Sequence, residues 1–378
     1  MAFNQDTKVG VLGGGQLGRM LIQSAVDFNL ELHMLDPDPQ APCHQLASSF
    51  TPGSLTDYNT VLEWGRQFEL LTIEIENVNV DALKALQQLG KQVYPQPEVI
   101  ALIQDKRTQK QFFQDKNIPT APFILTENRQ EVSQHLQFLP AMHKLGREGY
   151  DGRGVQRISS AQDLEKAFDK PGLLEKLIDF ETEISVIVAR NANGEEKAFP
   201  AVEMVFHPEH NLVEYLFAPA RLAPKVIEEA EQIALKVIRE LNMVGLLAVE
   251  MFVTKEGTVL VNEVAPRPHN SGHQTIEANV TSQYEQHLRS ILGLPLGDTA
   301  AKIPSAMVNL LGEAEYSGPA RYEGMEEVLQ LSGVHVHLYG KKLTKPFRKM
   351  GHVTIVDLNL DRLREKATFV KNTLKIKA

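Results

Sequence analysis

The sequence predicts an α/β protein with an N-terminal, doubly wound parallel sheet, followed by an α+β region. Strand and helix patterns alternate over the first ninety-odd residues, as expected for a parallel sheet with helices on both faces. From residue 120 the pattern is mixed, and short β-like runs dominate after Pro295. A chain of 378 residues is long enough for two or three domains.

Apolar runs bounded by turn residues predict the N-terminal strands, and amphipathic stretches predict the helices between them. We expect a strand at 9–12, a helical stretch at 19–28, a strand at 31–35, a helix at 58–68, a strand at 70–75, a helix at 80–89 and a strand at 92–94. Such a sheet binds ligands at the carboxyl ends of its strands. Pro95-Gln96-Pro97 marks a domain boundary.

The remaining elements follow from the same signals. A polar helix is expected at 105–116, ended by Asn117-Ile118-Pro119, and an amphipathic helix at 224–241 with a proline near its start. Strands are expected at 246–254 and 258–264, and short β-like runs at 306–311, 334–339 and 352–358 precede a final basic helix.

The composition restricts the class of protein. Thirty-nine Lys and Arg against 48 Asp and Glu give a net charge of −9, which argues against a surface that coats nucleic acid. The single cysteine excludes an internal disulfide framework and suits a reducing cytoplasm. The N-terminus lacks a secretory signal pattern, and the most apolar run, 243–253, is too short to cross a bilayer. We therefore expect a cytoplasmic globular protein.

The first strand is followed by Gly13-Gly14-Gly15-Gln16-Leu17-Gly18, a G-x-G-x-x-G motif that opens a helix. Glycines let the backbone approach an anion, and a helix N-terminus supplies free N–H donors. Asp36, at the end of the next strand, could hold a ribose hydroxyl. The motif fits either a dinucleotide site or an ordinary tight turn. Because a better nucleotide site lies further along the chain, we disfavour NAD.

Glu74 and Glu76 close the third strand of this region. Alternation places both side chains on one face, at the edge where ligands bind. They form either a solvated edge or, beside the glycine-rich turn, a hydrogen-bonding site for amines or hydroxyls.

A second nucleotide site is indicated by a glycine-rich loop at 146–154, which follows a strand ending at Lys144. Such a loop can close over phosphates with its backbone N–H groups. Lys106 lies at a helix start upstream, and either Glu175 or Glu183 could bind ribose or adenine. Each feature taken alone also fits a hairpin tip or a solvated face.

The acidic pair Glu250 and Glu263 is more informative. A two-residue turn at Glu256-Gly257 would pair Lys255 with Thr258 and place the two glutamates directly opposite, on one face. Two close carboxylates repel unless a cation bridges them, and Mg²⁺ takes few carboxylates plus phosphate oxygens. We therefore predict a divalent-metal site here rather than two exposed acids.

The segment Pro266-Arg267-Pro268-His269-Asn270-Ser271-Gly272-His273 follows directly. Its prolines make it extended and rigid, and Arg267, His269 and Asn270 are donors for an anion or a developing oxyanion. Zinc is disfavoured because no Cys or further His completes a ligand set. Elsewhere, we expect a polar surface at His335 and His337 and packing roles for Cys43 and Trp64.

Several of these stretches occur together in the order typical of one family: 13–18 with Gln16, 149–154, Asn262-Glu263, 266–273, and Arg348-Lys349-Met350-Gly351-His352. On them, the chain resembles the N5-carboxyaminoimidazole ribonucleotide synthase family, ATP-grasp enzymes of purine biosynthesis. The resemblance extends from residue 9 to about residue 356. The P-R-P-H-N-S-G-H and R-K-M-G-H strings carry most of its specificity.

The resemblance implies an ATP-grasp fold of three domains. These are a Rossmann-like (pre-ATP-grasp) domain at 1–100, an ATP-grasp domain at 101–298 with a smaller lid at about 120–195, and a small β-rich C-terminal domain at 299–378. It also implies a homodimer that acts on small molecules, with neither nucleic acid nor membrane as a partner.

The resemblance also implies the site residues. ATP would be surrounded by Lys106, Lys144, Gly149, Tyr150, Asp151, Gly152, Arg153, Gly154, Val155, Glu175, Lys176, Leu177, Ile178, Glu183, Asn262 and Glu263. Mg²⁺, or Mn²⁺ as a substitute, would lie between Glu250 and Glu263. The acceptor, 5-aminoimidazole ribonucleotide, would be approached by Gln16, Leu17, Glu74 or Glu76, Tyr150, Asp151 and Arg153, with its 5′-phosphate held by Lys341 and Arg348. The catalytic residues would be Tyr150 and the bicarbonate-binding Arg267, His269 and Asn270.

The implied reaction has two steps. Bicarbonate attacks the γ-phosphate of ATP, giving ADP and carboxyphosphate, and the exocyclic amine of the acceptor then takes the carboxyl group, directly or through CO₂, as phosphate leaves. The sequence departs from the family at two positions. Ala265 stands where many ATP-grasp enzymes carry Asn, and Phe206 stands where the family often has a histidine, with His207 displaced by one residue.

Three other functions remain to be distinguished. A Rossmann-type dehydrogenase would bind NAD but would leave the two glutamates and the segment 266–273 without a role. A different ATP-grasp ligase, acting on an amino acid or on glycinamide ribonucleotide, is distinguished by the 348–352 string. A nucleotide-sensing module would bind ATP without releasing ADP.

Overall fold

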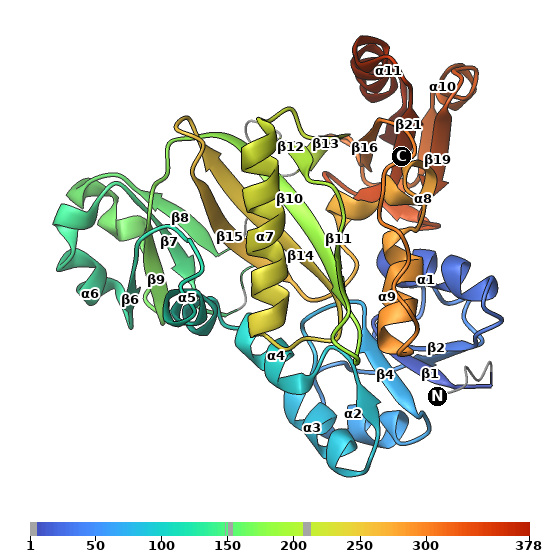
Figure 1. Cartoon of the computed structure of the whole chain (residues 1–378), viewed down its shortest axis with the longest axis horizontal. Helices are drawn as coiled ribbons and strands as arrows, with labels where there is room; N and C mark the ends of the chain where they lie inside the picture. Colours follow the sequence, from blue (N-terminus) through green and yellow to red (C-terminus); the bar gives the residue numbers. More distant parts are fainter. Residues whose placement is uncertain (1–5, 148, 150–153, 207–212) are drawn as a thin grey trace.

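The computed structural model describes residues 6–147, 149, 154–206 and 213–378. A long sheet runs through the middle of the molecule. The N-terminal sheet lies below it, a four-stranded sheet lies to the left, and the C-terminal helices lie at the upper right (Figure 1).

The N-terminal sheet has five parallel strands in the order β3-β2-β1-β4-β5. The predicted doubly wound sheet is therefore confirmed. Helix α4 begins at Pro97, directly after the predicted boundary, and was not expected. The elements are β1 (Val9–Leu12), α1 (Gln16–Val26), β2 (Leu32–Asp36), β3 (Ser49–Pro52), α2 (Tyr58–Gly65), β4 (Leu70–Ile73), α3 (Val80–Gln88), β5 (Gln92–Val93) and α4 (Pro97–Ile103).

Two apolar clusters cover the two faces of this sheet. On one face, α2 and α3 bury Trp64 and Leu83 together with Ile100 of α4. On the other face, Leu17 and Leu21 of α1 pack together with residues of α9 (Gln283–Ile291), a helix more than 250 residues further along the chain. Cys43 is fully buried in this second cluster, so the packing roles predicted for Cys43 and Trp64 are confirmed.

A four-stranded antiparallel sheet, order β6-β9-β7-β8, forms a separate small layer. We call this layer the lid sheet. Its own apolar cluster includes Val132, Ile158 and Leu174. The elements are α5 (Lys106–Asp115), β6 (Phe123–Thr126), α6 (Arg129–Ser133), η1 (Leu136–Phe138), β7 (Ala141–Leu145), β8 (Val155–Ile158), η2 (Ala161–Lys166) and β9 (Gly172–Lys176).

The long sheet follows the order β15-β14-β10-β12-β13-β16-β21-β19, with β11 paired to β10. The C-terminal strands thus extend the same sheet. Its elements are β10 (Phe180–Arg190), β11 (Glu196–Ala198), β12 (Val202–Phe206), β13 (Val213–Ala218), α7 (Pro224–Glu240), β14 (Gly245–Thr254), β15 (Val259–Ala265), η3 (Asn270–Gly272), α8 (Thr275–Ala278), β16 (Ser305–Leu311), β19 (Val334–Leu338) and β21 (Lys349–Val356).

Helix α7 illustrates why the local sequence folds as it does. Proline occupies its first turn, where no backbone N–H is needed. Its buried residues, Ala230, Ile233, Ala234, Val237 and Ile238, recur at helical spacing and pack on one face of the long sheet. The predicted amphipathic helix is confirmed, and it ends one residue early.

Short strands and two helices complete the C-terminal part: β17 (Gly318–Pro319), β18 (Arg321–Glu323), α10 (Met325–Leu329), β20 (Leu343–Thr344), α11 (Leu360–Thr373) and β22 (Lys375–Lys377). The β-like run expected at 352–358 is strand β21, which begins three residues earlier because Lys349 pairs with Leu311.

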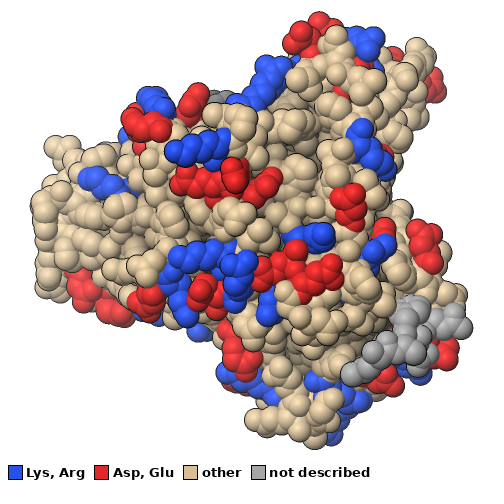
Figure 2. All heavy atoms as spheres, in the orientation of Figure 1, with Lys and Arg blue, Asp and Glu red and all other residues tan. Residues whose placement is uncertain are grey.

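The surface shows no simple charge polarity on the face drawn in Figure 2, where basic and acidic side chains alternate. Among the helices of the described residues, none combines the length and the apolar content that a bilayer crossing requires.

A buried hydrogen bond ties α9 to the N-terminal sheet. His287 Nε2 lies 2.9 Å from Oγ1 of Thr72 on β4, and both side chains are fully buried. We expect Thr72→Val to lower the free energy of unfolding by about 1–3 kcal/mol, because the histidine loses its partner in an apolar environment. Urea denaturation monitored by circular dichroism measures this change. Thr368→Val on exposed α11 is the control, expected to change stability by less than about 0.5 kcal/mol; equal effects of the two substitutions would contradict the assignment.

Candidate active site

The glycine-rich turn is occupied by carboxylates of the chain itself. Gly14 N–H donates to Asp36 Oδ2 at 2.7 Å, and Leu17 N–H donates to Glu74 Oε1 at 3.1 Å. A Cβ at Gly15 would overlap the Glu74 carboxylate. Burial raises the pKa of Glu74 to about 7, against the attraction of Arg267. The N–H groups that would hold a pyrophosphate are already used, which argues against a dinucleotide site.

Glu76 has a different partner from Glu74. Its Oε1 lies 2.8 Å from Nε of Arg267, in the segment that follows β15. The strand β4 ends at Ile73, so the two glutamates stand on the loop beyond it rather than on a strand face. This ion pair brings the edge of the N-terminal sheet against the proline-rich segment 266–273.

Glu250 and Glu263 face each other across β14 and β15, as predicted. The predicted turn, however, is wrong. The loop has three residues, Lys255 to Gly257, with Gly257 in the left-handed region (φ +81°) and Thr254 N–H donating to Thr258 O. A bulge at Asn262 then shifts the register by one and restores the pairing of the two glutamates.

The bulge gives Asn262 and Glu263 separate contacts at the same site. Asn262 Oδ1 accepts from Lys144 Nζ at 3.0 Å, and Glu263 Oε2 forms an ion pair with Lys106. Lys106 holds the pKa of Glu263 well below its ordinary value. Burial, together with the nearby charges of Glu263 and Glu183, raises the pKa of Glu250.

These carboxylates belong to one row across three strands. Ser185 on β10 lies opposite Glu250, and Glu250 lies opposite Glu263. Glu183, two residues before Ser185, shares its face. Among the described residues no group of three or more His, Cys, Asp or Glu side chains is arranged to hold a metal. Protein ligation at this row would therefore rest on the two facing glutamates, which suits Mg²⁺ bound mainly through phosphates and water.

Lysines from α5 and β7 lie next to this row of carboxylates. Lys144 Nζ at the end of β7 lies 2.6 Å from Glu175 Oε1 on β9. Lys110 Nζ, one turn after Lys106 on α5, lies 2.5 Å from the other oxygen of Glu175. The sequence analysis missed Lys110, although its i+4 spacing from Lys106 places the two on one helix face.

The segment 266–273 is held by a two-point contact from α9. His269 N–H donates to Gln283 Oε1 and Gln283 Nε2 donates to His269 O, both at 2.8 Å. His269 Nδ1 accepts from Ser271 N–H at 3.3 Å, while Nε2 lies 3.4 Å from Glu250 Oε1. Burial, with the positive charges of Arg267 and Lys349, lowers the pKa of His269 to about 3. The imidazole is therefore neutral, with its proton on Nε2. Asn270 begins the short helix η3 next to it.

The basic run near the C-terminus lies against this segment. Arg348 Nη1 donates to Leu343 O at 2.7 Å, and Lys341 Nζ donates to Lys349 O at 2.8 Å. The charge of Lys349 lowers the pKa of Glu250 and of His269. Lys349 is a second residue that the sequence analysis missed; its place between Arg348 and the buried Met350 gave no separate signal.

Part of the predicted nucleotide loop is not among the described residues. Tyr150, Asp151, Gly152 and Arg153 lie outside the described residues, as does His207. Gly149 and Gly154 border the loop, and Gly154 has φ +74° where the chain turns into β8 at Val155. The Lys176 side chain donates to Phe138 O and Leu139 O, just before β7, so its ammonium is directed away from the position expected for a nucleotide contact.

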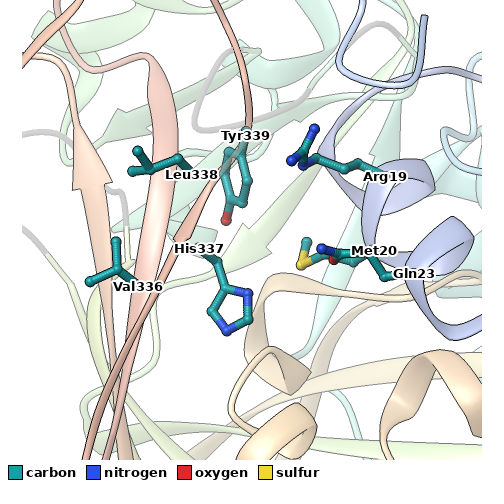
Figure 3. Close-up of a pocket in the computed structure, with 7 residues that line it drawn as sticks. All are labelled: Arg19, Met20, Gln23, Val336, His337, Leu338 and Tyr339. Carbon is teal, nitrogen blue, oxygen red and sulfur yellow. The ribbon is translucent and has the colours of Figure 1, made fainter. Parts of the chain in front are cut away.

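The polar surface expected at His337 is wrong. His337 stacks on His352 with ring centroids 4.4 Å apart, and its Nε2 lies 2.7 Å from Glu277 Oε1. His352 stacks in turn on His273, and both are buried. His335, two residues earlier on the same face of β19, is exposed as expected. A cavity of about 250 Å³ lies between α1 and β19 near this stack, lined by Arg19, Gln23 and Tyr339 among others (Figure 3) and by none of the predicted site residues.

Models of known protein families match three parts of the chain. A ribonucleotide synthetase preATP-grasp domain matches residues 6–104, an ATP-grasp domain matches 111–284, and a phosphoribosylaminoimidazole carboxylase C-terminal domain matches 305–366. The N5-carboxyaminoimidazole ribonucleotide synthase of Bacillus subtilis (strain 168) is 37% identical over 92% of this chain and 91% of its own length. The chain belongs to the N5-carboxyaminoimidazole ribonucleotide synthase family.

Solved structures of the family agree. The Thermotoga maritima N5-carboxyaminoimidazole ribonucleotide synthetase superposes with a TM-score of 0.90 at 40% identity, covering 98% of this chain and 99% of that one. An Aspergillus clavatus enzyme in complex with ADP and 5-aminoimidazole ribonucleotide superposes with a TM-score of 0.87 at 31% identity, covering 97% and 99%. The chain spans 65% of the length of the chloroplastic phosphoribosylaminoimidazole carboxylase of Vigna aconitifolia, to which it is 38% identical over 95% of its own length.

Membership of the N5-carboxyaminoimidazole ribonucleotide synthase family confirms the predicted ATP-grasp fold. The chain is an ATP-grasp ligase, not a dehydrogenase of the Rossmann class. The matched ATP-grasp range, 111–284, includes the lid sheet and strands β10 to β15 of the long sheet, and Lys144 of the lid sheet donates to Asn262 of the long sheet.

The buried carboxyl of Glu183 allows the charge interactions at the carboxylate row to be tested through the pH dependence of stability. Burial, opposed by Lys144 and reinforced by Glu263, raises the pKa of Glu183 from 4.5 to about 7. The contribution of Glu183 to the stability of the wild-type chain should therefore fall as the pH rises from 4.5 to 7, because this carboxyl ionises more readily when the chain is unfolded. Glu183→Gln removes this loss, so the variant should be more stable than wild type at pH 8 by on the order of 2–3 kcal/mol, and the difference should shrink towards pH 4.5.

Urea unfolding at pH 4.5, 6 and 8 measures this difference. Glu181→Gln, an exposed neighbour on the same strand, is the control and should show no such trend. A stability difference for Glu183→Gln that does not change with pH would contradict the assignment.

Proposed function

We propose that this chain carboxylates the exocyclic amine of 5-aminoimidazole ribonucleotide with bicarbonate, consuming ATP and releasing ADP and phosphate. One observation carries the proposal. Of the two facing glutamates, Glu263 forms an ion pair with Lys106, which belongs to the predicted nucleotide site. Glu250 lies beside His269, which belongs to the proline-rich segment. A phosphoryl group bound at this pair would thus lie between the predicted nucleotide site and the predicted bicarbonate site.

The nucleotide would lie between the lid sheet and the long sheet. Lys106 and Lys144 supply positive charge for its phosphates, and the end of β9, Lys176 to Ile178, offers backbone groups for the adenine. Glu183, on the same face as the carboxylate row, is placed for the ribose. Glycines 149 and 154 border the loop that would cover the phosphates. These assignments are supported by position and charge.

Glu250 and Glu263 would hold Mg²⁺, for which Mn²⁺ is a chemically similar substitute. When bound, the metal neutralises charge on the transferring phosphoryl group. The facing geometry fits this role, since two carboxylates on neighbouring strands need a compensating cation at close range. Ala265 supplies no ligand, so the set rests on the two glutamates.

Bicarbonate would bind at Arg267, His269 and Asn270. Arg267 supplies a positive charge, and the neutral imidazole of His269 can donate a hydrogen bond from Nε2. Gln283 fixes the backbone of His269, so the donor direction is set before the substrate arrives. Bicarbonate oxygen attacking the γ-phosphorus would give carboxyphosphate with ADP as the leaving group.

The acceptor would bind at the edge of the N-terminal sheet, near Gln16, Leu17, Glu74 and Glu76. The ion pair between Glu76 and Arg267 supports this placement, because it joins the acceptor edge to the bicarbonate segment. The amine would then attack the carboxyl carbon, lose a proton and displace phosphate. Lys341 and Arg348 would hold the 5′-phosphate, and Tyr150, Asp151 and Arg153 would approach from the loop.

The broader properties of the chain also remain proposals. We propose a homodimer acting in the cytoplasm on small molecules only, as the resemblance implies. The domain boundaries near residues 100 and 298, with a lid at about 120–195, are proposed on the same basis.

An ADP-release assay tests the function. We expect ADP to form with bicarbonate and 5-aminoimidazole ribonucleotide together, to stop on chelation of divalent metal, and to return with Mg²⁺ or Mn²⁺. Glycinamide ribonucleotide and amino acids, offered as acceptors, should give no increase. ADP release that depends on glycinamide ribonucleotide would assign the other ligase activity, and ATP binding without release would indicate a sensing module.

Arg348→Met tests the phosphate contact of the acceptor. Losing charge-assisted hydrogen bonds from a guanidinium costs roughly 2–4 kcal/mol, so use of 5-aminoimidazole ribonucleotide should weaken about 30- to 1000-fold. The Michaelis constant for ATP should hardly move, because the nucleotide site lies on other strands. Steady-state kinetics with each substrate varied in turn measures both. An equal rise in the two constants, or no rise in either, would show that Arg348 does not hold the phosphate.

A further inference from the structure

Lys110 is a buried lysine that none of the assignments above uses. It lies on α5, and its side chain is 3% exposed. Its ammonium forms an ion pair with Glu175 at 2.5 Å and donates to Thr120 Oγ1 at 2.6 Å and Val261 O at 3.4 Å. These partners come from β9 of the lid sheet, from the segment before β6, and from β15 of the long sheet. Lys110 therefore links the two sheets between which the nucleotide is proposed to lie.

Glu175 is shared between two lysines. Its Oε1 takes Lys144 at 2.6 Å and its Oε2 takes Lys110 at 2.5 Å, and the carboxylate is itself only 3% exposed. Burial raises the pKa of Glu175, but Lys144 and Lys110 more than offset this and lower it overall. Two ammonium groups and one carboxylate leave a net charge of one positive unit in this cluster.

We propose that Lys110 is a positioning residue for nucleotide binding: it occupies one oxygen of Glu175, aims the other at Lys144, and leaves Lys144 with net positive charge for the phosphates of a nucleoside triphosphate. The inference rests on the proposed function, because it assumes that Lys144 faces those phosphates. Without Lys110, the negative charge of Glu175 would neutralise Lys144 alone, and the positive charge available to the phosphates would be lost. Lys144 also donates to Asn262 on the long sheet, so its orientation would affect the same site.

The charge of Lys110 itself depends on pH. Burial lowers its pKa to about 8, against the attraction of Glu175 and with further lowering by Lys144 and Lys106. Among the described residues, these three groups, from β9, β7 and its own helix, have the largest charge effects on Lys110. Lys110 should lose its charge as the pH rises through 8, and nucleotide affinity should fall with it. Arginine at this position would stay charged over the same range.

Calorimetric titration with β,γ-imido ATP and Mg²⁺, without any acceptor, tests the proposal on the full chain. Lys110→Met should weaken binding at pH 7 by tenfold or more. Lys110→Arg should bind within about threefold of wild type at pH 7. Between pH 7 and 9.5 the wild type should lose affinity relative to Lys110→Arg, because other titrating groups are common to both. Lys116→Met, just beyond the same helix and paired with Glu240 at the surface, should match the wild type throughout.

The outcomes separate the possibilities. Wild-type affinity in a folded Lys110→Met, or identical pH profiles for wild type and Lys110→Arg, would overturn the proposal. Should Lys110→Met fail to fold, the comparison of those two pH profiles decides alone. A wild-type chain that binds the analogue yet releases no ADP with bicarbonate and 5-aminoimidazole ribonucleotide would overturn the proposed function and leave the role of Lys110 standing.

Discussion

The repulsion between Glu250 and Glu263 is the constraint on which the arrangement of the site depends. Two acids directly opposite on neighbouring strands are stable only if positive charge or a proton compensates them. Lys106 from α5 and Lys349 from β21 contribute to that compensation, whereas His269, which lies beside Glu250, is neutral. The site thus draws on chain segments more than 240 residues apart, Lys106 on α5 and Lys349 on β21.

How far the sequence predicts the fold depends on whether the signal is local. The alternating strands and helices of the first hundred residues and the apolar stripe of α7 are local patterns, and both were predicted apart from β3 and α4. The role of α9 in covering the N-terminal sheet was not predicted, since the partner surfaces are remote in sequence. The pairing of Glu250 with Glu263 was predicted correctly, but from a two-residue turn that the structure does not have. The three-residue loop shifts the register by one residue, and the bulge at Asn262 shifts it back.

In the candidate site, too, local motifs were predicted and contacts between remote segments were not. Motifs with a strict order of residue types, such as the segment 266–273, identified the carboxylate, lysine and proline-rich components. Lys110 and Lys349 were missed because a lysine in a polar helix or a basic run resembles a solvated one until burial is known. The glycine-rich turn misleads for a related reason. Its backbone geometry suits a pyrophosphate, but whether Glu74 already occupies the N–H groups depends on a tertiary contact 57 residues away.

The contribution of α9 to the N-terminal sheet affects how the chain is made. The buried side of α1 that faces away from the sheet packs in one cluster with Tyr284, Leu288 and Ile291 of α9 and with Tyr339. A ribosome that has released the first hundred residues has therefore exposed the apolar side of α1, and that side must wait for almost two hundred more residues before α9 can cover it. Translation of this interval takes on the order of ten seconds or more. During that time the nascent N-terminal segment exposes apolar surface of the kind that chaperones bind. A gene fragment that ends near residue 100 encodes the N-terminal sheet without α9.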